Sequence, residues 1–246
     1  MRLDLYLSEN GYAQSRNRAQ HLIRSGLVLL DGRTVLSPSF EVDINALHRI
    51  QVTQDCPYVG RGGLKLEAAL DAFGLSPCGA HALDVGASTG GFTDCLLQRG
   101  AAHVVAVDSG QSQLHESLRN DERVTSMEGQ NARYLRPELL PYAPDFVVMD
   151  VSFISQTLLH PVLAGLCAPG AVLVSLIKPQ FELTRKELDK HGIVRRQQDR
   201  DRAIARVTES AALCGFGQLR VMPSPIAGGD GNLEYLLAGI RDATDG

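Results

Sequence analysis

From Tyr58 onward, short apolar runs of β-forming residues alternate with segments whose apolar residues recur at helical spacing. The expected strands are HALDV, HVVAVD, a run near RVTSM, DFVVMD and AVLVSLI, and the expected helices cover residues 63–73, 91–98, 155–165 and 198–213. Apolar strands that alternate with helices are typical of a sheet covered on both faces, so the pattern predicts a doubly wound, mostly parallel α/β fold. Two final β runs, FGQLRVM and EYLLAGI, predict an antiparallel hairpin at the edge of this sheet.

The first part of the chain has a different pattern, in which two short helical segments precede short β runs. Apolar residues at positions 3 to 7 predict a first helix that ends near Gly11, and Ser15 is a candidate N-cap for a second helix that stops at Gly26. LVLLDGRTVL then places two β runs about an Asp-Gly turn, which indicates a hairpin, and HRIQVT adds a further run. Such a small α+β module could hardly enclose a catalytic pocket, so we expect a binding domain. The expected boundaries are 1–56 for this domain, 57–62 for a linker and 63–246 for the larger domain.

Composition limits the classes of protein that fit. A chain of 246 residues with 44% hydrophobic content can form two unequal domains with a real core. It contains no run of eighteen apolar residues, and its N-terminus, MRLDLYLSENGYAQ, lacks the apolar block of a signal peptide, so we expect a cytoplasmic protein that does not insert into membranes. The five cysteines include no C-x-x-C pair and the seven histidines show no metal-ligand spacing, which favours free thiols and predicts no metal.

Charge is unevenly distributed along the chain. The formal net charge of −4 gives no overall signature of a nucleic-acid-binding protein, so RNA would have to bind a local patch. The stretch 11–30 contains no acid, and Arg16, Arg18 and Arg24 lie there on one expected helix. A second cluster of five arginines within 195–206 is interleaved with acids, and we interpret it as a solvated helix face.

The sequence ALDVGASTGGFTDCLL predicts a strand, a glycine-rich turn and a helix, and Asp108 ends the next expected strand. Glycines let the backbone approach a ligand, the helix N-terminus supplies N–H donors, and an acid at this distance can accept both hydroxyls of a ribose. The spacing matches neither G-x-G-x-x-G nor a P-loop, and Asp84 would repel a pyrophosphate but could hold the cationic methionine moiety of S-adenosylmethionine. We therefore expect this cofactor rather than NAD or a purely structural turn. The candidate cofactor residues are Asp84, Gly86, Ser88, Thr89, Gly90, Gly91, Phe92, Asp108 and Asn131.

Four ionisable residues are expected near the carboxyl ends of the strands, where open α/β sheets bind ligands. Asp150 ends DFVVMD, Lys178 ends AVLVSLI, Glu234 opens the final β run, and Lys65 lies on the helix before the first strand of the sheet. Each has an ordinary explanation alone: a helix cap, a lysine that reaches solvent from a strand end, a sheet-edge charge and a solvated helix residue. Two lysines and two acids that converge on one pocket indicate a catalytic site.

Further motifs extend over nearly the whole chain: GRGGLKLEAAL, LDVGASTGGFTDCLLQRGAAHVVAVDSGQSQL, VMDVSFIS, LIKPQFE, HGIVR and GNLEYLL. Together they resemble the TlyA family, RNA ribose methyltransferases in which a small S-four RNA-binding domain precedes an FtsJ-like catalytic domain. The resemblance implies a Rossmann-like, S-adenosylmethionine-dependent methyltransferase domain that methylates the 2′-oxygen of a cytidine in ribosomal RNA. The family's Lys-Asp-Lys-Glu tetrad falls on Lys65, Asp150, Lys178 and Glu234. One departure is Gly60, which stands before RGG where serine is expected.

The N-terminal pattern RLDLYL…G…SRNRAQHLIRSGLVLLDGRTV resembles the S-four domain itself. In that family the second helix and the following hairpin face RNA, so the resemblance implies phosphate contacts that set register without reading sequence. The candidate RNA-binding residues are Arg16, Arg18, His21, Arg24 and Arg61. Because residues 1–56 carry six arginines against six acids, we expect this domain alone to bind RNA weakly.

The tetrad suits methyl transfer to a ribose hydroxyl, which is a poor nucleophile at neutral pH and needs a group that aligns it and takes or attracts its proton. Lys178 is the candidate, held by Asp150, while Lys65 and Glu234 would align the ribose. The two acids favour the charged form of Lys178, whereas burial and the second cation favour the neutral form. Both a true base and an orienting cation therefore stay open.

Other chemistries and functions fit less well. Methylation of an exocyclic nitrogen usually shows a D/N-P-P-Y tetrapeptide where this chain has DVSF, and Cys78 lies at the wrong end of the sheet for attack on cytosine. Two alternatives are a membrane-active haemolysin, a label that proteins of this family carry, and a catalytically inactive RNA-binding or ribosome assembly factor. The N-terminus begins close to the first helix, which favours large-subunit ribosomal RNA; free RNA, an assembling particle and a ribosomal subunit are all candidate substrates.

Overall fold

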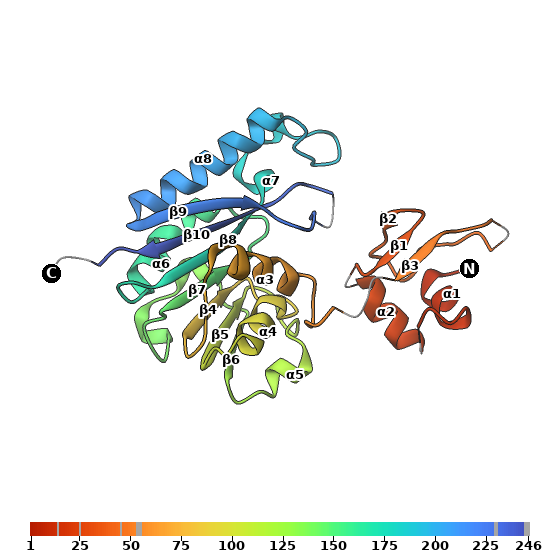
Figure 1. Cartoon of the computed structure of the whole chain (residues 1–246), viewed down its shortest axis with the longest axis horizontal. Coiled ribbons are helices and arrows are strands. Elements are labelled where there is room, and N and C mark those ends of the chain that lie inside the picture. Colours follow the sequence, from red (N-terminus) through yellow and green to blue (C-terminus); the bar gives the residue numbers. More distant parts are fainter. Residues whose placement is uncertain (14, 25, 45, 53–55, 229–230, 244–246) are drawn as a thin grey trace. The chain divides into compact units, whose positions relative to one another are not determined.

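The computed structural model describes residues 1–13, 15–24, 26–44, 46–52, 56–228 and 231–243. The chain divides into two compact units, Met1–Arg61 and Gly62–Gly246 (Figure 1). This division falls inside the stretch that the sequence assigns to a linker.

The first unit contains two helices and a small antiparallel sheet. Its elements are α1 (Leu3–Glu9), α2 (Arg16–Arg24), β1 (Val28–Leu30), β2 (Arg33–Thr34) and β3 (Ile50–Val52), with strand order β2-β1-β3. The hydroxyl of Ser15 accepts a hydrogen bond from the Arg18 amide at 3.2 Å, so the predicted N-cap of α2 is confirmed. Asp31 and Gly32 both have positive φ, 51° and 78°, which is the conformation of a two-residue hairpin turn.

The second unit is built on a sheet with strand order β6-β5-β4-β7-β8-β10-β9. Its strands are β4 (His81–Val85), β5 (His103–Asp108), β6 (Val124–Glu128), β7 (Phe146–Met149), β8 (Val172–Ile177), β9 (Phe216–Pro223) and β10 (Tyr235–Arg241). Strands β6, β5, β4, β7 and β8 are parallel, whereas β10 runs antiparallel to both β8 and β9. The predicted doubly wound sheet with an antiparallel final pair is therefore confirmed.

Helices cover both faces of this sheet (Figure 1). They are α3 (Gly62–Phe73), α4 (Gly91–Gln98), α5 (Glu116–Arg119), α6 (His160–Leu166), α7 (Pro179–Glu182) and α8 (Gln197–Leu213), with single 3-10 turns η1 (Ala132–Tyr134), η2 (Pro137–Leu139), η3 (Gln156–Leu158) and η4 (Arg185–Glu187). Leu163 of α6 and Val207 of α8 are buried in one core with Leu83, Val147 and Leu173 of the central strands. Each such fully buried side chain contributes about 1.5–3 kcal/mol, so the sheet is a rigid base for the loops at its edge. No helix in the described ranges combines the length and apolar character needed to cross a bilayer.

The helix expected at 155–165 is wrong in its extent. The structure has η3 at Gln156–Leu158 and a separate α6 that begins at His160. Ser155 caps the first turn by accepting a hydrogen bond from the Thr157 amide, and Pro161 lies in the first turn of α6, where no N–H donor is needed. The sequence therefore contains two helix-start signals, Ser155 and Pro161, where the apolar periodicity alone indicated one helix.

Candidate active site

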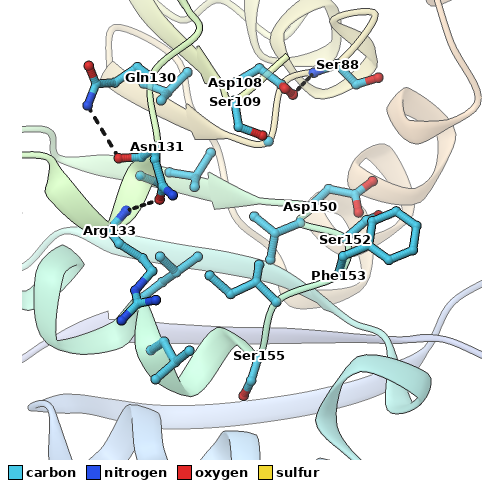
Figure 2. A pocket seen from close by; sticks show the side chains of 18 of the residues that line it. Ser88, Asp108, Ser109, Gln130, Asn131, Arg133, Asp150, Ser152, Phe153 and Ser155 are labelled. Atoms are coloured by element: carbon cyan, nitrogen blue, oxygen red, sulfur yellow. Dashed lines mark hydrogen bonds between the residues drawn. The ribbon is translucent and has the colours of Figure 1, made fainter.

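Loops that follow the parallel strands of the second unit surround a cavity of about 690 Å³. Its polar lining side chains come from the end of β5 and from the segments that follow β4, β5, β6 and β7, and Figure 2 labels most of them. They are Ser88, Asp108, Ser109, Gln113, Gln130, Asn131, Arg133, Asp150, Ser152 and Ser155. A cavity at the carboxyl ends of parallel strands is where this class of fold binds ligands.

Glycine is required at two positions of the turn after β4. Gly86 has φ 85°, and a Cβ there would collide with the carbonyl group of Asp150, so the turns after β4 and β7 can approach closely only with glycine. Gly90, with φ 96°, backs onto Leu114 and Leu118. The first glycine shapes the cavity, while the second is needed for packing.

Asp108 is held in a fixed orientation at the end of β5. Its two carboxylate oxygens accept hydrogen bonds from the backbone amides of Ser88, at 2.8 Å, and Gly110, at 2.7 Å. Ser88 reaches this position with a left-handed φ of 48°, which is uncommon for a residue with a side chain. Each carboxylate oxygen has a further lone pair, so Asp108 can still accept hydrogen bonds from ribose hydroxyls within the cavity that it lines.

Asp84 of β4 is fully buried and lies outside the cavity lining, next to Val85, which does line it. Oδ2 accepts a hydrogen bond from the Thr93 hydroxyl at 2.7 Å, whereas the buried Oδ1 has no partner among the described residues. Burial, with a smaller contribution from the nearby charge of Asp150, raises the pKa of this carboxyl to about 7, although the hydrogen bond from Thr93 opposes the shift. An unpartnered buried oxygen that resists ionisation fits a site for a cationic amine, which is what S-adenosylmethionine carries on its methionine moiety.

The remaining candidate cofactor residues divide into two groups. Asn131 lines the cavity and orders it locally, because its side-chain oxygen accepts a hydrogen bond from the Arg133 amide at 3.0 Å (Figure 2). Thr89, Gly90, Gly91 and Phe92 lie outside the cavity lining, and Phe92 is buried in contact distance of Gly62. These four positions shape the turn and the start of α4 instead of bordering the cavity.

Asp150 and Lys178 form an ion pair at the cavity edge. The Lys178 ammonium lies 2.6 Å from Asp150 Oδ1 and donates a hydrogen bond to the Ser152 hydroxyl at 2.9 Å. Asp150 follows β7 and Lys178 follows β8, and these strands are neighbours in the sheet. The strand-end lysine therefore has a specific partner, and both side chains keep some exposure, 23% for the acid and 13% for the lysine.

Lys65 and Glu234 form a second and more deeply buried ion pair. The Lys65 ammonium lies 2.5 Å from Glu234 Oε2, with side-chain exposures of 11% and 3%. A Cβ on Gly228 would lie 2.5 Å from Glu234 Oε1, so the Gly228 backbone lies close against this carboxylate. Removing one partner of a buried ion pair strongly destabilises the folded protein, because the other charge is left buried without a partner. Lys65 and Glu234 are therefore expected to hold each other in place.

Strand register brings the two pairs to the same edge of the sheet. Tyr235 of β10 pairs with Ile177 of β8 in antiparallel register, so Glu234 and Lys178 are the next residues beyond that pair. Asp150 likewise follows Met149, which pairs with Val85 just before the glycine turn. Asp150, Lys178 and Glu234 thus lie at the ends of three neighbouring strands, and Lys65 of α3 is paired with Glu234; that the four act on one substrate remains a prediction.

Sequence reasoning missed a network that fixes the loop after β7. The buried carboxylate of Glu182 in α7 accepts hydrogen bonds from the Ser155 hydroxyl, at 2.5 Å, and the Gln156 amide, at 2.9 Å. The Gln156 side chain donates to the Leu176 carbonyl of β8 at 2.6 Å. This network ties the loop that carries Asp150 to the segment that carries Lys178. LIKPQFE contains the acid, but nothing in its spacing identified the partners.

The same loop exposes an aromatic ring beside the ion pair. Phe153 is 91% exposed and has a left-handed φ of 63°, which is a strained conformation for a bulky residue. Its ring lies 5.0 Å from that of Phe181 in α7, and it lines the cavity together with Asp150 and Ser152 (Figure 2). An exposed aromatic side chain held at this cost points to a ligand with a flat face.

The candidate RNA-binding arginines of the first unit differ in their surroundings. Arg16 lies 3.0 Å from Oδ2 of the buried Asp4, which also accepts hydrogen bonds from Arg2 and Gln20. Arg24, at the end of α2, is exposed. Arg16 thus has a structural role in this unit whether or not it also contacts RNA.

The other candidates in the first unit are less directly placed. Arg18 is half-buried on α2, and the Arg61 guanidinium lies against Gly26, where a Cβ would approach within 2.6 Å. His21 belongs to α2, but its side chain lies outside the described part of the structure.

Comparison with known proteins agrees with these features. Residues 58–241 match the FtsJ-like methyltransferase family and residues 1–47 match the S4 (S-four) domain. A 16S/23S rRNA (cytidine-2'-O)-methyltransferase TlyA from Mycobacterium tuberculosis is 42% identical, with 99% of this chain and 91% of that protein covered. Hemolysin A from Brachyspira hyodysenteriae is 43% identical over 96% of this chain and 98% of its own length.

A solved structure is also similar to this chain over nearly its whole length. The structure of a protein described as a hemolysin from Streptococcus thermophilus is 39% identical, covers 98% of this chain and 88% of that one, and superposes with a TM-score of 0.78. The chain therefore belongs to the TlyA family, in which an S-four domain precedes an FtsJ-like, S-adenosylmethionine-dependent methyltransferase domain.

Proposed function

We propose that this protein transfers a methyl group from S-adenosylmethionine to the ribose 2′-oxygen of a cytidine in ribosomal RNA. The observation that carries the proposal is the presence of two ion pairs, Lys178–Asp150 and Lys65–Glu234, at one edge of the sheet, where Asp150 also lines the cavity. The relative from Mycobacterium tuberculosis is named for this activity, and the chain matches it over nearly its whole length.

The chain's own residues are suited to hold the cofactor. Asp108 would accept the ribose hydroxyls of the adenosyl group, and the unpartnered Oδ1 of Asp84 would accept the ammonium of the methionine group. The bound cofactor supplies an electrophilic methyl carbon on a sulfonium. Cationic amine binding would stabilise the carboxylate form of Asp84, which burial otherwise disfavours.

Lys178 is proposed to act as a cation that positions the nucleophile. The Lys178 ammonium is paired with Asp150 at 2.6 Å and donates a hydrogen bond to the Ser152 hydroxyl, and an ammonium has three N–H donors, so it can also donate to the ribose 2′-oxygen. Methylation of the 2′-oxygen requires its hydroxyl proton to leave, and the Asp150 carboxylate, which lies beside the Lys178 ammonium, would accept that proton. Of the two roles that the sequence left open, the ion pair favours the orienting cation.

Phe153 is proposed to receive the base of the target nucleotide. RNA enzymes that act on one nucleotide separate it from its stacked neighbours and hold its base against aromatic side chains. An exposed ring adjacent to Asp150 and Ser152 offers such a surface where the ribose would reach Lys178. A hemolysin name belongs to some relatives, whereas the cavity and ion pairs of this chain are explained by methyl transfer.

The proposal is tested by mapping ribose methylation in ribosomal RNA from cells that have or lack this protein, in both subunits. We expect at least one 2′-O-methylcytidine to disappear on deletion and to return with the wild-type gene but not with Lys178→Ala. Identical methylation maps with and without the protein would contradict it. Return of the modification with Lys178→Ala would refute the role given to Lys178.

A further inference from the structure

The segment Thr184–Arg196 joins α7 to α8 and carries a mixed set of charges (the cyan loop between these helices in Figure 1). Read as sequence alone, it has five cations, Arg185, Lys186, Lys190, Arg195 and Arg196, against the acids Glu187 and Asp189. In the structure, some of these charged groups form hydrogen bonds or ion pairs with nearby residues, and the others face solvent. This separation decides what the segment can bind.

Both acids form hydrogen bonds and ion pairs that order the segment. Glu187 accepts hydrogen bonds from the amide and hydroxyl of Thr184, at 2.7 and 2.8 Å, and from Arg202 at 2.6 Å. Asp189 accepts bonds from the amides of His191 and Ile193 and pairs with Arg195 at 2.8 Å. The acids therefore pre-form the loop instead of neutralising its outer surface.

Four cations of the segment point to solvent. Arg185, Lys186, Lys190 and Arg196 are exposed, and within the described part of the chain no ion pair involves any of them. The arginines of α8 behave differently: Arg200 donates to the carbonyls of Val194 and Arg195, both at 2.9 Å. Arg196 of the cluster 195–206 is exposed and precedes α8, so it lies next to the other exposed cations of the segment.

The segment is anchored to the active site at both ends. Its start follows α7, which begins directly after Lys178. Near its end, the buried Asn232 accepts a hydrogen bond from the Val194 amide at 3.0 Å and donates one to the Gly192 carbonyl at 3.1 Å, and Asn232 lies two residues before Glu234. An ordered cationic loop is thus tied to the two strands that supply Lys178 and Glu234.

We propose that Arg185, Lys186, Lys190 and Arg196 form an RNA-backbone contact surface of the methyltransferase unit, binding phosphates that flank the target nucleotide. A pre-ordered set of unpaired cations suits a polyanion, since each phosphate contact releases condensed counterions. Such contacts set the position of the RNA without reading its sequence. The inference rests on the proposed function for the identity of the polyanion, and it adds a binding surface outside the first unit.

The test compares two double variants of the full chain with a matched control. Arg185→Gln/Lys186→Gln and Lys190→Gln/Arg196→Gln each remove two surface cations, and Arg123→Gln/Arg220→Gln removes two cations that lie away from the segment, one paired with Asp121 and one stacked on Phe73. Binding to purified large and small ribosomal subunits that lack the modification is measured against salt concentration. Binding of S-adenosylmethionine reports whether the fold is intact.

For each segment variant we expect the slope of log affinity against log salt to become shallower by about 1.4–1.8, corresponding to two lost phosphate contacts. Affinity at physiological salt should fall roughly five- to thirtyfold, with cofactor binding unchanged. A wild-type slope in both segment variants, or an equal change in the control, would overturn the proposal. If the wild-type protein bound subunits but methylated none, the proposed function would fail while this binding result could still stand.

Discussion

Lys178 gives the most direct test of how the active site works. It pairs with Asp150 at 2.6 Å, so the two residues are expected to act as one unit. We predict that Lys178→Met and Asp150→Asn each lower kcat by about 10²–10⁴-fold and that the double variant is little worse than either, because groups that act together are strongly non-additive. Single-turnover methyl transfer measures these rates, and the dissociation constant for S-adenosylmethionine should change little in Lys178→Met. Independent, additive losses would show that the residues do not act as a pair.

Asp84 predicts a dependence of stability on pH with a definite sign. Burial raises its folded pKa to about 7, above the usual value of 3.8, so the folded protein retains a proton that the unfolded chain has lost. The free energy of unfolding without cofactor should therefore fall as pH rises from about 4 to 7. Compared with Asp84→Asn, the wild-type protein should lose roughly 1.4 kcal/mol more per pH unit. Urea unfolding of both proteins across this range measures the difference.

Asp121 provides a control of opposite sign for that experiment. The adjacent Arg123 lowers the pKa of Asp121, so its contribution to stability is present at neutral pH and is lost as pH falls. Asp121→Asn should therefore not flatten the decline assigned to Asp84. Equal slopes in wild type and Asp84→Asn would show that this carboxyl is not the titrating group.

At the scale of secondary-structure elements, the sequence predicted the features that follow from local periodicity. It did not predict the features that depend on side-chain contacts between distant segments. The strands around HALDV and HVVAVD and the Ser15 cap follow from local pattern, and the edge positions of Asp150, Lys178 and Glu234 follow from strand direction. The separate start of α6 was missed because one apolar periodicity runs through two elements. In the segment after β6 the sequence singled out Asn131 but not Gln130 and Arg133, which also line the cavity, because no local pattern marks them.

Glu182 links two elements of the site, and its loss should act through geometry. We predict that Glu182→Ala leaves the Gln156 amide unpaired and destabilises the protein by about 1–3 kcal/mol, while Glu182→Gln, which keeps one acceptor, destabilises it less. In Glu182→Gln, kcat should fall about tenfold with cofactor affinity unchanged, since the loop carrying Asp150 is loosened. Denaturant midpoints and methyl-transfer rates separate the two effects. Unaltered kcat in both variants would indicate that the network only stabilises the fold.

For the chain as a whole, RNA binding should be separable from stability within the first unit. Arg24 is exposed, whereas Arg16 contacts the buried Asp4, whose pKa is held well below its usual range by Arg2 and by further hydrogen bonds. We predict that Arg24→Gln weakens binding to ribosomal subunits several-fold with an unchanged melting temperature, while Arg16→Gln lowers the melting temperature as well. Thermal unfolding and subunit binding of the two variants measure this contrast. A lowered melting temperature in Arg24→Gln, or none in Arg16→Gln, would reverse the assignment.

The decisive measurement for the chemistry is nucleoside analysis after reaction of the purified protein with labelled S-adenosylmethionine and unmodified ribosomal subunits. We predict that the label appears in 2′-O-methylcytidine with the wild-type protein and is absent with Lys178→Ala. Label on a base atom, or equal labelling by Lys178→Ala, would contradict ribose methylation by the Lys178–Asp150 pair.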